Sequence, residues 1–536
     1  MKINNRTKTL WYVALPILIV VACVLQPQAR AQMTSTGIDC SQIAALHLLK
    51  QDNMRAGLTL IECGIVQGGR PSGSGDEVTG DSPQPPNILV SNRSCTSGNS
   101  CTHSESMVFA SPRAGDHTVV VNYNDETGSG SDYSGVSYSL DGGSTFTQIV
   151  PSPFGTGHGT NFGDPIVVFD AKLAMWFAGD LATGCGGQGI GTWKSPDGQN
   201  WTVSACAHNG GSDDRESMWV DNAPYSRAYG RMYVSFNNFN VGGGALFVTH
   251  SDDGVTWSTP VQVANGTPFI RDVQITGTLP GQIPPSATWM SPVFLEGMDE
   301  GSGGLSTRQN VMYRSTDGGA TWTSSTQGPR FNPVGDAGTC GYFAKVNPIW
   351  RHMGWGEPAV GPNGTIHYAY AGKGTASGDN GDIFYVRSTD NGVTWSAPIK
   401  LNDDTGGQFK TQWMPSVSVN YSPTSPLPQA KVTVSWYDRR AATSACNVAT
   451  DPGCSYERYG IQSADNGATW GANFAISTQL IPQPNQNDPF IQSCYAGDYD
   501  YSTALGSTAY VTWTDGRVAI GGVQVQDVEF TAVPEP

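Results

Sequence analysis

The sequence is poor in charge and lacks the common nucleotide and metalloprotease motifs. Only 14% of its residues are charged, and acids outnumber Lys and Arg by 45 to 29, which gives a net charge of −16. Such an acidic chain is a poor partner for nucleic acid or for an anionic membrane surface. It has no Gly-x-x-x-x-Gly-Lys loop and no His-Glu-x-x-His motif. Glycine is abundant, with 66 residues beside 34 prolines, which is typical of a β protein with many tight turns.

The chain also lacks any Cys-x-x-Cys pair, which argues against a structural zinc site. Residues 1–31 have the features of a cleavable signal peptide: a basic start, an apolar run from Leu10 to Leu25 and the small-residue site Ala29-Arg30-Ala31. A membrane anchor is the alternative, but the run is short for a span of about 20 residues. We therefore expect a secreted or periplasmic protein with no membrane contact after signal cleavage.

Eleven cysteines fall to ten once Cys23 leaves with the signal, and an even count in an exported chain indicates disulfide bonds. Short separations favour four pairs, and the last two cysteines would pair across the fold. The expected pairs are Cys40–Cys63, Cys95–Cys101, Cys185–Cys206, Cys446–Cys454 and Cys340–Cys494. Other connectivities stay open at this point.

The composition divides the rest of the chain into distinct parts. Residues 32–66 carry apolar side chains at helical spacing, and we expect a helical hairpin closed by Cys40 and Cys63. Residues 67–85 are rich in Gly, Ser and Pro and are expected to be a linker. Residues 86–532 alternate strand-like runs with turns, so we expect one all-β domain, followed by a short tail at 533–536.

One turn recurs six times in the β region. Its fullest form is STDGGATW at 315–322, an Asp–Gly turn with an aromatic residue just after it. The turn aspartates are Asp141, Asp197, Asp253, Asp317, Asp390 and Asp465, spaced 56 to 75 residues apart. Each copy stands between two strand-like runs, so it is a hairpin loop, and the spacing fits a unit of several strands. Asp can accept hydrogen bonds from its own turn, glycine supplies positive φ, and the aromatic ring packs inward.

The pattern Ser-x-Asp-x-Gly-x-Thr-Trp resembles the Asp box, or BNR repeat, of the sialidase superfamily. The resemblance implies a β-propeller in which each box lies between the third and fourth strands of a blade, away from the active face. Six boxes mark six blades. The run PNILVSN before the first box and three strand-like runs after the last would complete another blade. We expect seven blades, with six as the alternative, since sialidases proper have six.

In a propeller blade the innermost strand starts at the rim to which the second strand returns, so residues at these positions gather around one mouth. Several innermost strands would open with a carboxylate, and these are the candidate catalytic acids and bases for glycoside cleavage: Glu105, Asp164, Glu216, Glu357 and Asp498. The candidate substrate-binding residues of the same rim are Arg215, Arg351, His352, Trp355, Asp438, Arg439, Arg440, Tyr495, Asp515 and Arg517. Arginines there could clamp a carboxylate. The competing interpretation is structural, because a repeated carboxylate can also bind the backbone of the next blade.

The resemblance is weaker at the level of catalytic motif. Sialidases hold the sialic acid carboxylate with three arginines, the first usually in a Phe/Tyr-Arg-Ile-Pro motif ahead of the first box, and this sequence has no such motif. FIRDV at 269–273 is the nearest string, but it falls between the third and fourth boxes. A triad could be drawn from the five arginines of the rim.

Two functions follow as expectations. The resemblance implies an exported sialidase-like glycoside hydrolase that acts on extracellular glycans. The alternative is a non-catalytic propeller that binds a glycan or an extracellular protein. We expect a monomer that needs no cofactor and has no dedicated metal site, with calcium as an optional ion.

Overall fold

The computed structural model describes residues 33–69, 87–91, 102–126, 132–278, 289–337, 340–347, 350–407, 409–420, 430–444, 453–520 and 523–536. The expected signal peptide, most of the expected linker, the Cys95–Cys101 pair and Cys446 lie outside these residues. In the part of the chain that is described, no helix is long and apolar enough to cross a membrane.

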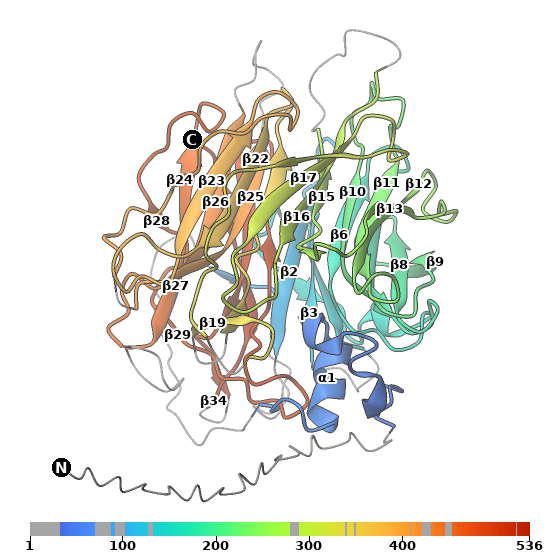
Figure 1. Cartoon of the computed structure of the whole chain (residues 1–536). Coiled ribbons are helices and arrows are strands. Elements are labelled where there is room, and N and C mark those ends of the chain that lie inside the picture. The colour runs from blue at the N-terminus through green and yellow to red at the C-terminus, as the bar shows by residue number, and fades with distance from the viewer. Residues whose placement is uncertain are drawn as a thin grey trace, which may run out of the picture.

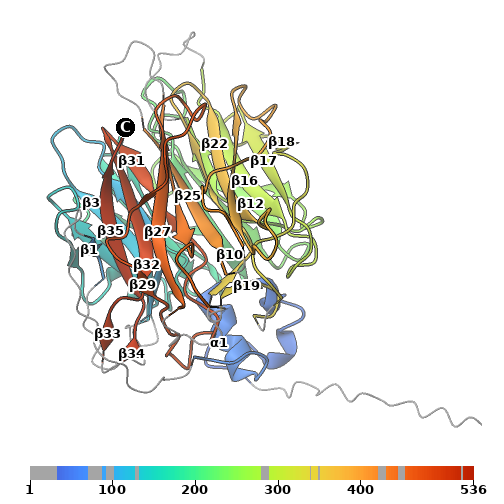
Figure 2. The ribbon, with the colours of Figure 1, turned by 90° about the vertical axis from the view of Figure 1, so that its left-hand side faces the viewer.

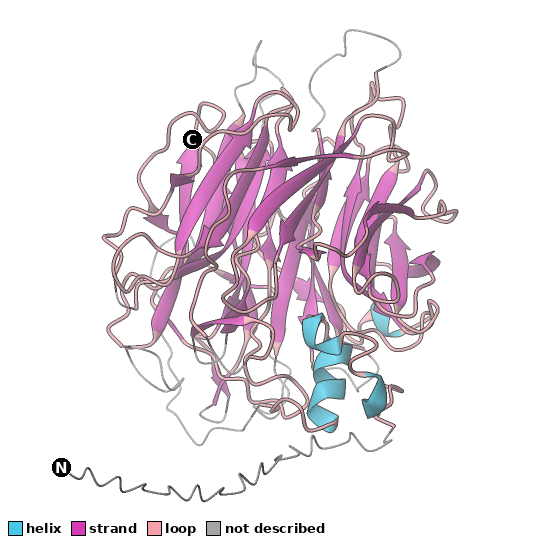
Figure 3. Cartoon of the chain, in the orientation of Figure 1, coloured by secondary structure: helices cyan, strands magenta, loops and turns pink. Residues whose placement is uncertain are grey.

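Seven blades of antiparallel strands form a β-propeller, as expected (Figures 1 and 3). The first three blades are built from β2 (His103–Ala110), β3 (Val119–Asp125), β4 (Ser134–Ser139) and β5 (Thr147–Gln148); β6 (Ile166–Asp170), β7 (Met175–Ala182), β8 (Gly189–Ser195) and β9 (Thr202–His208); and β10 (Asp213–Val220), β11 (Met232–Asn238), β12 (Ala245–Ser251) and β13 (Val261–Ala264). The fourth contains β14 (Ile270–Arg271), β15 (Ile275–Gly277), β16 (Val293–Asp299), β17 (Gln309–Ser315) and β18 (Thr323–Thr326).

The last three blades complete the ring. They contain β21 (Glu357–Val360), β22 (Ile366–Gly372), β23 (Asp382–Ser388) and β24 (Ile399–Lys400); β25 (Gln412–Asn420), β26 (Lys431–Asp438), β27 (Ser455–Ser463), β28 (Phe474–Ala475) and β29 (Ile481–Pro482); and β31 (Thr503–Leu505), β32 (Thr508–Asp515), β35 (Asp527–Pro534) and β1 (Ile88–Leu89). Three further short pieces are β30 (Asp500–Tyr501), the hairpin β19 (Ala344–Asn347) with β20 (Trp350–His352), and the hairpin β33 (Ala519–Ile520) with β34 (Val523–Gln524).

The seventh blade closes the ring with strands from both ends of the chain, as the sequence predicts. β1 supplies its outer strand, where Ile88 lies opposite Phe530 of β35. The imidazole of His103 on β2 adds a second link, since its two nitrogens lie 3.3 Å from carboxylate oxygens of Asp125 and Asp527. Closure of this kind removes the exposed edge of an open sheet. Because β35 runs to Pro534, the expected tail at 533–536 begins inside the last strand.

The central strands are buried on both faces because the blades stack against one another. Every residue of β3 and of β6 is buried, so these strands show no alternation of buried and exposed residues. Such near-continuous burial is typical of strands covered on both sides. Tryptophans fill the space between blades, and Trp176, Trp193, Trp350 and Trp413 are fully enclosed.

All six repeated turns lie between the third and fourth strands of their blades. In the turn after β17, the Ser315 hydroxyl donates to Asp317 Oδ1 (2.8 Å) and accepts from Gly319 N (2.9 Å). Thr321 N donates to the same carboxylate at 2.9 Å, and Trp322 Nε1 donates to the Gly319 carbonyl at 3.1 Å. The hydrogen bonds of the carboxylate are therefore made within its own turn. We interpret each copy as a structural element that holds a hairpin together, and not as a catalytic site.

Residues 33–69 form a small unit at one end of the propeller, which we call the cap (Figures 1 and 2). It contains two 3₁₀ turns, Cys40–Gln42 and Leu48–Lys50, and one α-helix, α1 (Met54–Glu62). The Cys40–Cys63 disulfide closes it, as expected, over a core of Ile38, Leu48, Ala56 and Leu60. The expected hairpin thus has one α-helical arm, because the first arm ends at a left-handed His47 (φ 52°) after a single short turn.

The cysteine predictions have mixed outcomes. The Cys185–Cys206 disulfide is confirmed. The expected Cys340–Cys494 bond is not formed: both residues are free, buried thiols in one cluster with Phe343 and Trp355. A hydrogen bond from Cys494 lowers the pKa of Cys340, so a thiol–thiol contact stands where a disulfide was expected.

Candidate functional site

Five of the innermost strands have a left-handed, non-glycine residue near or just before their starts. These residues are Glu105 (φ 51°), Asp164 (φ 62°), Arg215 (φ 58°), Asp272 (φ 58°) and Met414 (φ 51°). This backbone conformation is unfavourable for a residue with a Cβ and persists where the surrounding structure demands it. In β2, β10 and β25 the register with the second strand shifts at the same point. A β-bulge of this kind redirects a side chain, and here it brings side chains of several blades to the centre of the ring.

Three arginines converge on one aspartate at that centre, two of them on its carboxylate and the third on its backbone carbonyl. They are Arg215 of β10, Arg271 of β14 and Arg351 of β20, and we call them the arginine seat. The carboxylate belongs to Asp52 of the cap. Arg271 Nη2 donates to its Oδ1, and Arg215 Nε lies 3.9 Å from its Oδ2. Arg351 Nη2 donates to the Asp52 backbone carbonyl at 2.6 Å.

Each arginine is held in place by partners of its own. Arg215 Nη2 donates to Asp272 (2.8 Å) and to the Tyr501 hydroxyl (2.7 Å). Its guanidinium also lies 4.1 Å from the ring centre of Tyr499 and 4.6 Å from that of Trp355. A guanidinium that is stacked and hydrogen-bonded in this way is preorganised for a planar carboxylate.

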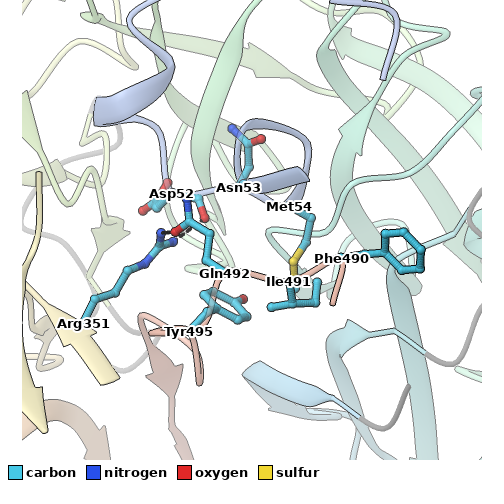
Figure 4. Close-up of a pocket in the computed structure, with 9 residues that line it drawn as sticks. Asp52, Asn53, Met54, Arg351, Phe490, Ile491, Gln492 and Tyr495 are labelled. Atoms are coloured by element: carbon cyan, nitrogen blue, oxygen red, sulfur yellow. Dashed lines mark hydrogen bonds between the residues drawn. The ribbon is translucent and has the colours of Figure 1, made fainter. Parts of the chain in front are cut away.

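The other two arginines are fixed in the same manner. Arg271 donates to Asp214 (2.5 Å) and to Asn237 (3.0 Å). Arg351 donates to Asp498 at 2.7 Å and to the side chain of Gln492, as Figure 4 illustrates for the latter contact. All three guanidinium groups are at most 2% exposed, so the attraction between their charges and a carboxylate is little screened by water.

The acids around the seat are pushed towards their neutral forms. Burial, together with the charges of Asp498 and Asp52, raises the pKa of Glu105 well above its usual range. Burial and the neighbouring Asp52 and Asp214 do the same to the pKa of Asp164. Both shifts favour the protonated form of these carboxyl groups.

The centre suits a guanidinium better than a metal ion. Oxygen atoms of Asp52, Asp164 and Asp214 lie within 4.8 Å of one another. Arg271 already bonds two of these three carboxylates, which supplies the compensating positive charge. Calcium takes six to eight oxygen ligands at about 2.3–2.6 Å. The donor set therefore does not fit the calcium ion that the sequence left as an option.

Seven of the predicted site residues come together here. They are Glu105, Asp164, Arg215, Arg351, Trp355, Tyr495 and Asp498. His352 lies close by, but burial and the charge of Arg215 lower its pKa to about 3, so it stays neutral. Its Nδ1 accepts from Gly354 N at 2.9 Å, which fixes the turn that leads into β21.

Two predicted acids have other surroundings. Glu216 was expected at the mouth, but the bulge in β10 places Arg215 there and leaves Glu216 buried near Asp164 and Asp180. Glu357 accepts hydrogen bonds from Ser416 and from the backbone amides of Val417 and Ser502, both at 3.2 Å.

The contacts of Glu357 are those of the structural interpretation, in which a carboxylate binds the backbone of a neighbouring blade. Two further acids make the same kind of contact. Asp164 accepts a hydrogen bond from Arg215 N at 3.0 Å, and Glu105 accepts one from Asp498 N at 2.8 Å. The acids of the mouth therefore join adjacent blades, whatever else they do.

The remaining predicted residues pair locally at the ends of second strands. Arg440 bonds Asp438 (2.8 Å) after β26, and Arg517 bonds Asp515 (2.7 Å) after β32. Arg439 donates to the Ser444 carbonyl at 3.1 Å. None of these contacts involves the arginine seat in the described residues, so these five side chains do not join it.

Sequence reasoning missed the central carboxylate and one arginine. Arg271 and Asp272 stand in the FIRDV string, which does not match the arginine motif of sialidases because it follows the third repeated turn instead of preceding the first. Asp52 gave no signal, since it lies in a cap that sequence patterns treat as a separate unit. Beside it a small cavity of about 10 Å³ is lined by residues of the cap, by Arg351 and by the loop 490–495 (Figure 4).

Comparisons with known proteins show likeness at the level of shape. No protein-family model matches the chain, and no curated protein matches it. An ulvan lyase structure bound to -[GlcA(1-4)Rha3S]- aligns with a TM-score of 0.44 and 12% identity over 82% of this chain and 96% of its own.

Two further solved structures are similar to a comparable extent. The intramolecular trans-sialidase from Ruminococcus gnavus, in complex with oseltamivir carboxylate, gives a TM-score of 0.37 and 13% identity over 82% of this chain and 95% of its own. A Penicillium chrysogenum α-L-arabinanase complexed with arabinobiose gives 0.38 and 12%, over 85% and 98%. These structural neighbours are propeller proteins that act on glycans, and at such identities the likeness is one of fold.

Proposed function

We propose that this chain is an exported, glycan-active propeller that recognises the carboxylate of an acidic sugar and hydrolyses the glycosidic bond beside it. The observation that carries the proposal is the arginine seat: three buried guanidinium groups from separate segments gather around Asp52, two on its carboxylate and one on its backbone carbonyl. Bidentate arginine contacts are the strongest common means of holding a carboxylate. The sialidase superfamily, which the repeated turns resemble, uses three arginines for this purpose.

The groups next to the seat can supply the proton transfers. Glycoside cleavage needs a carboxylic acid that is still protonated near neutral pH to protonate the leaving oxygen. Glu105 and Asp164 are the candidates for this role, because burial and neighbouring acids raise both pKa values. Asn124 Nδ2 donates to Glu105 (2.6 Å) and to the Tyr495 hydroxyl (2.7 Å), and so holds a tyrosine beside one of these acids.

The second candidate function is a non-catalytic propeller that binds a glycan or an extracellular protein. One observation favours it: an amide, Asn124, stands between Glu105 and Tyr495, whereas sialidases pair a tyrosine nucleophile directly with a glutamate. A tyrosine without a base in contact with its hydroxyl is a weak nucleophile at neutral pH, since its unperturbed pKa is about 10. The two functions therefore differ in turnover, and both require the carboxylate to be bound.

The test measures turnover and affinity together. Fluorophore release from a synthetic α-sialoside and from a β-glucuronide is followed for the secreted chain and for Asp52→Ala, because Asp52 occupies the seat. Arg351→Lys, made in Asp52→Ala, removes the planar guanidinium group of one seat arginine. The matched control is Arg231→Lys, which changes an outer arginine that pairs with Asp252 at 2.7 Å.

Hydrolysis that falls by at least about tenfold in Arg351→Lys and not in Arg231→Lys supports the enzyme. Binding of N-acetylneuraminate or glucuronate without turnover supports the binding protein. If neither sugar acid binds and neither substrate is cleaved by any of the variants, the carboxylate-sugar function is refuted.

A further inference from the structure

The tip of the cap enters the centre of the propeller. Gln51, Asp52 and Asn53 connect the second 3₁₀ turn to α1, and each is at most 4% exposed. Figure 4 shows Asp52 and Asn53 beside Arg351 and Gln492. Asn53 caps the helix by accepting from Ala56 N at 2.8 Å, so the start of α1 fixes where the tip points. The carboxylate of Asp52 thus arrives at the arginine seat from a part of the chain outside the blades.

The tip makes the contacts that a bound ligand would make. Its carboxylate meets Arg271 and Arg215, and its carbonyl accepts from Arg351. Its neighbour Asn53 donates to Asp214 Oδ1 at 2.6 Å. A carboxylate, a carbonyl and an amide within a few bonds of one another are also the polar groups of an acidic amino sugar.

The fit of Asp52 in the seat is incomplete. Its Oδ2 has no hydrogen-bond partner among the described residues, and the same is true of Nε and Nη1 of Arg215 and of Nε of Arg271. All these atoms are buried, where an unmade hydrogen bond costs about 1–3 kcal/mol. The seat therefore holds buried donors that Asp52 leaves unused and that a carboxylate placed with bidentate geometry would use.

Asp52 is also badly placed for a purely stabilising residue. Its negative charge raises the pKa of Glu105, Asp164 and Asp214, which means that it repels the acids around it. A buried ion pair contributes little net stability after its desolvation cost. The position of the Asp52 carboxylate is therefore explained better by competition with a ligand for the arginine seat than by a contribution to the stability of the fold.

We propose that Asp52 is an intramolecular substitute for the ligand carboxylate, and that the cap is an autoinhibitory plug of the arginine seat. The ligand and the cap then exclude one another, and the ligand binds only to molecules in which the tip of the cap has left the seat. The apparent affinity for a ligand is lowered by the fraction of molecules whose cap is in place. The identity of the ligand rests on the proposed function; the plug itself does not.

The plug is tested with small carboxylates on the full chain. Thermal unfolding of the natural chain, Asp52→Ala, Asp52→Asn and the control Glu62→Gln is measured in sodium formate, acetate and chloride of equal ionic strength. Glu62 lies at the far end of α1 and bonds Ser35, so its variant makes the same charge change in the cap away from the seat.

Formate and acetate are expected to stabilise Asp52→Ala by several degrees over chloride, and to leave the natural chain and Glu62→Gln unchanged. Asp52→Asn keeps the shape of the tip, and should show a smaller response because its amide still fills the space. If neither Asp52 variant distinguishes carboxylates from chloride, the seat does not bind carboxylates in place of Asp52 and the proposal is overturned.

A second measurement follows the cap of the natural chain by hydrogen exchange, with and without saturating N-acetylneuraminate or glucuronate. Faster exchange in residues 48–62 upon binding supports mutual exclusion, and unchanged or slower exchange in a chain that binds the sugar overturns it. A formate response without binding of either sugar acid supports the plug and refutes the proposed function, so the two failures are distinguishable.

Discussion

The buried histidine that joins the first and last blades should make the stability of the ring depend on alkaline pH. His103 is fully buried between Asp125 and Asp527, and although burial opposes its charge, the two carboxylates raise its pKa from 6.5 to about 10. The folded chain then binds a proton that the unfolded chain has released in this window. Stability from this residue is complete below pH 6.5 and is lost as the pH rises through 10.

The size of the effect follows from the shift. Each pKa unit corresponds to about 1.4 kcal/mol, so the contribution of His103 to the free energy of unfolding should fall by about 3 kcal/mol between pH 7 and pH 10. In His103→Asn this contribution is absent. The variant should therefore be less stable than the natural chain at pH 7 by roughly that amount, and the gap should shrink towards pH 10.

The assay is urea unfolding at pH 7, 8.5 and 10, followed by tryptophan fluorescence and far-ultraviolet circular dichroism. The matched control is His367→Asn. His367 is equally buried and bonds Tyr385 (2.6 Å), but burial lowers its pKa to about 3, so it is neutral throughout this range. Its substitution should cost the same at every pH. A gap between the natural chain and His103→Asn that is equal at pH 7 and pH 10 would refute the charged-histidine link.

Three other predictions concern the turns, the cap and the blade contacts. Asp390→Ala removes the hydrogen bonds that hold one repeated turn and lower the pKa of Asp390 to about 2, so it should cost about 1–2 kcal/mol in urea unfolding at pH 7. In the natural chain the stability contributed by Asp390 is present above pH 3.8 and is lost as the pH falls through 2. If Asp390→Ala had the same urea midpoint as the natural chain at pH 7, the prediction would be contradicted. Replacing both Cys40 and Cys63 by serine should speed hydrogen exchange in residues 33–69 without changing exchange in the blades, because the disulfide closes only the cap. Burial raises the pKa of Glu357 to about 8, so the stability that its protonated form contributes is lost between pH 4.5 and 8. The free energy of unfolding of Glu357→Gln should therefore rise relative to that of the natural chain from pH 6 to pH 8.5 in the same assay. A difference that stays constant over this range would contradict the prediction.

The architecture could be predicted from the sequence because its signals are local. In each repeated turn the aspartate makes its hydrogen bonds within about five residues of the chain. The sequence pattern is therefore sufficient to predict the conformation of the turn. Counting these turns and the strand-like runs at both ends was enough to predict seven blades, the last of them built from both ends of the chain.

The mouth was predicted only in part, because bulges break the alignment of the blades. The runs around Glu105 and Glu216 read alike, as Glu-Ser-Met in both, yet the register shifts put Glu105 and Arg215 at equivalent positions. An extra residue in a strand moves every later side chain to the other face. Sequence similarity between blades therefore hides the one-residue shift that puts Arg215, and not Glu216, at the position equivalent to Glu105.

The composition and spacing of the chain determined that it would fold as an acidic, turn-rich propeller with a separate disulfide-closed cap. Only the tertiary structure decided that the cap inserts Asp52 among Arg215, Arg271 and Arg351. These residues come from segments far apart in the chain and meet because seven blades close into a ring. Their attraction depends on burial at its centre, where a low dielectric makes a carboxylate and three guanidinium groups interact strongly, and no local pattern encodes that environment.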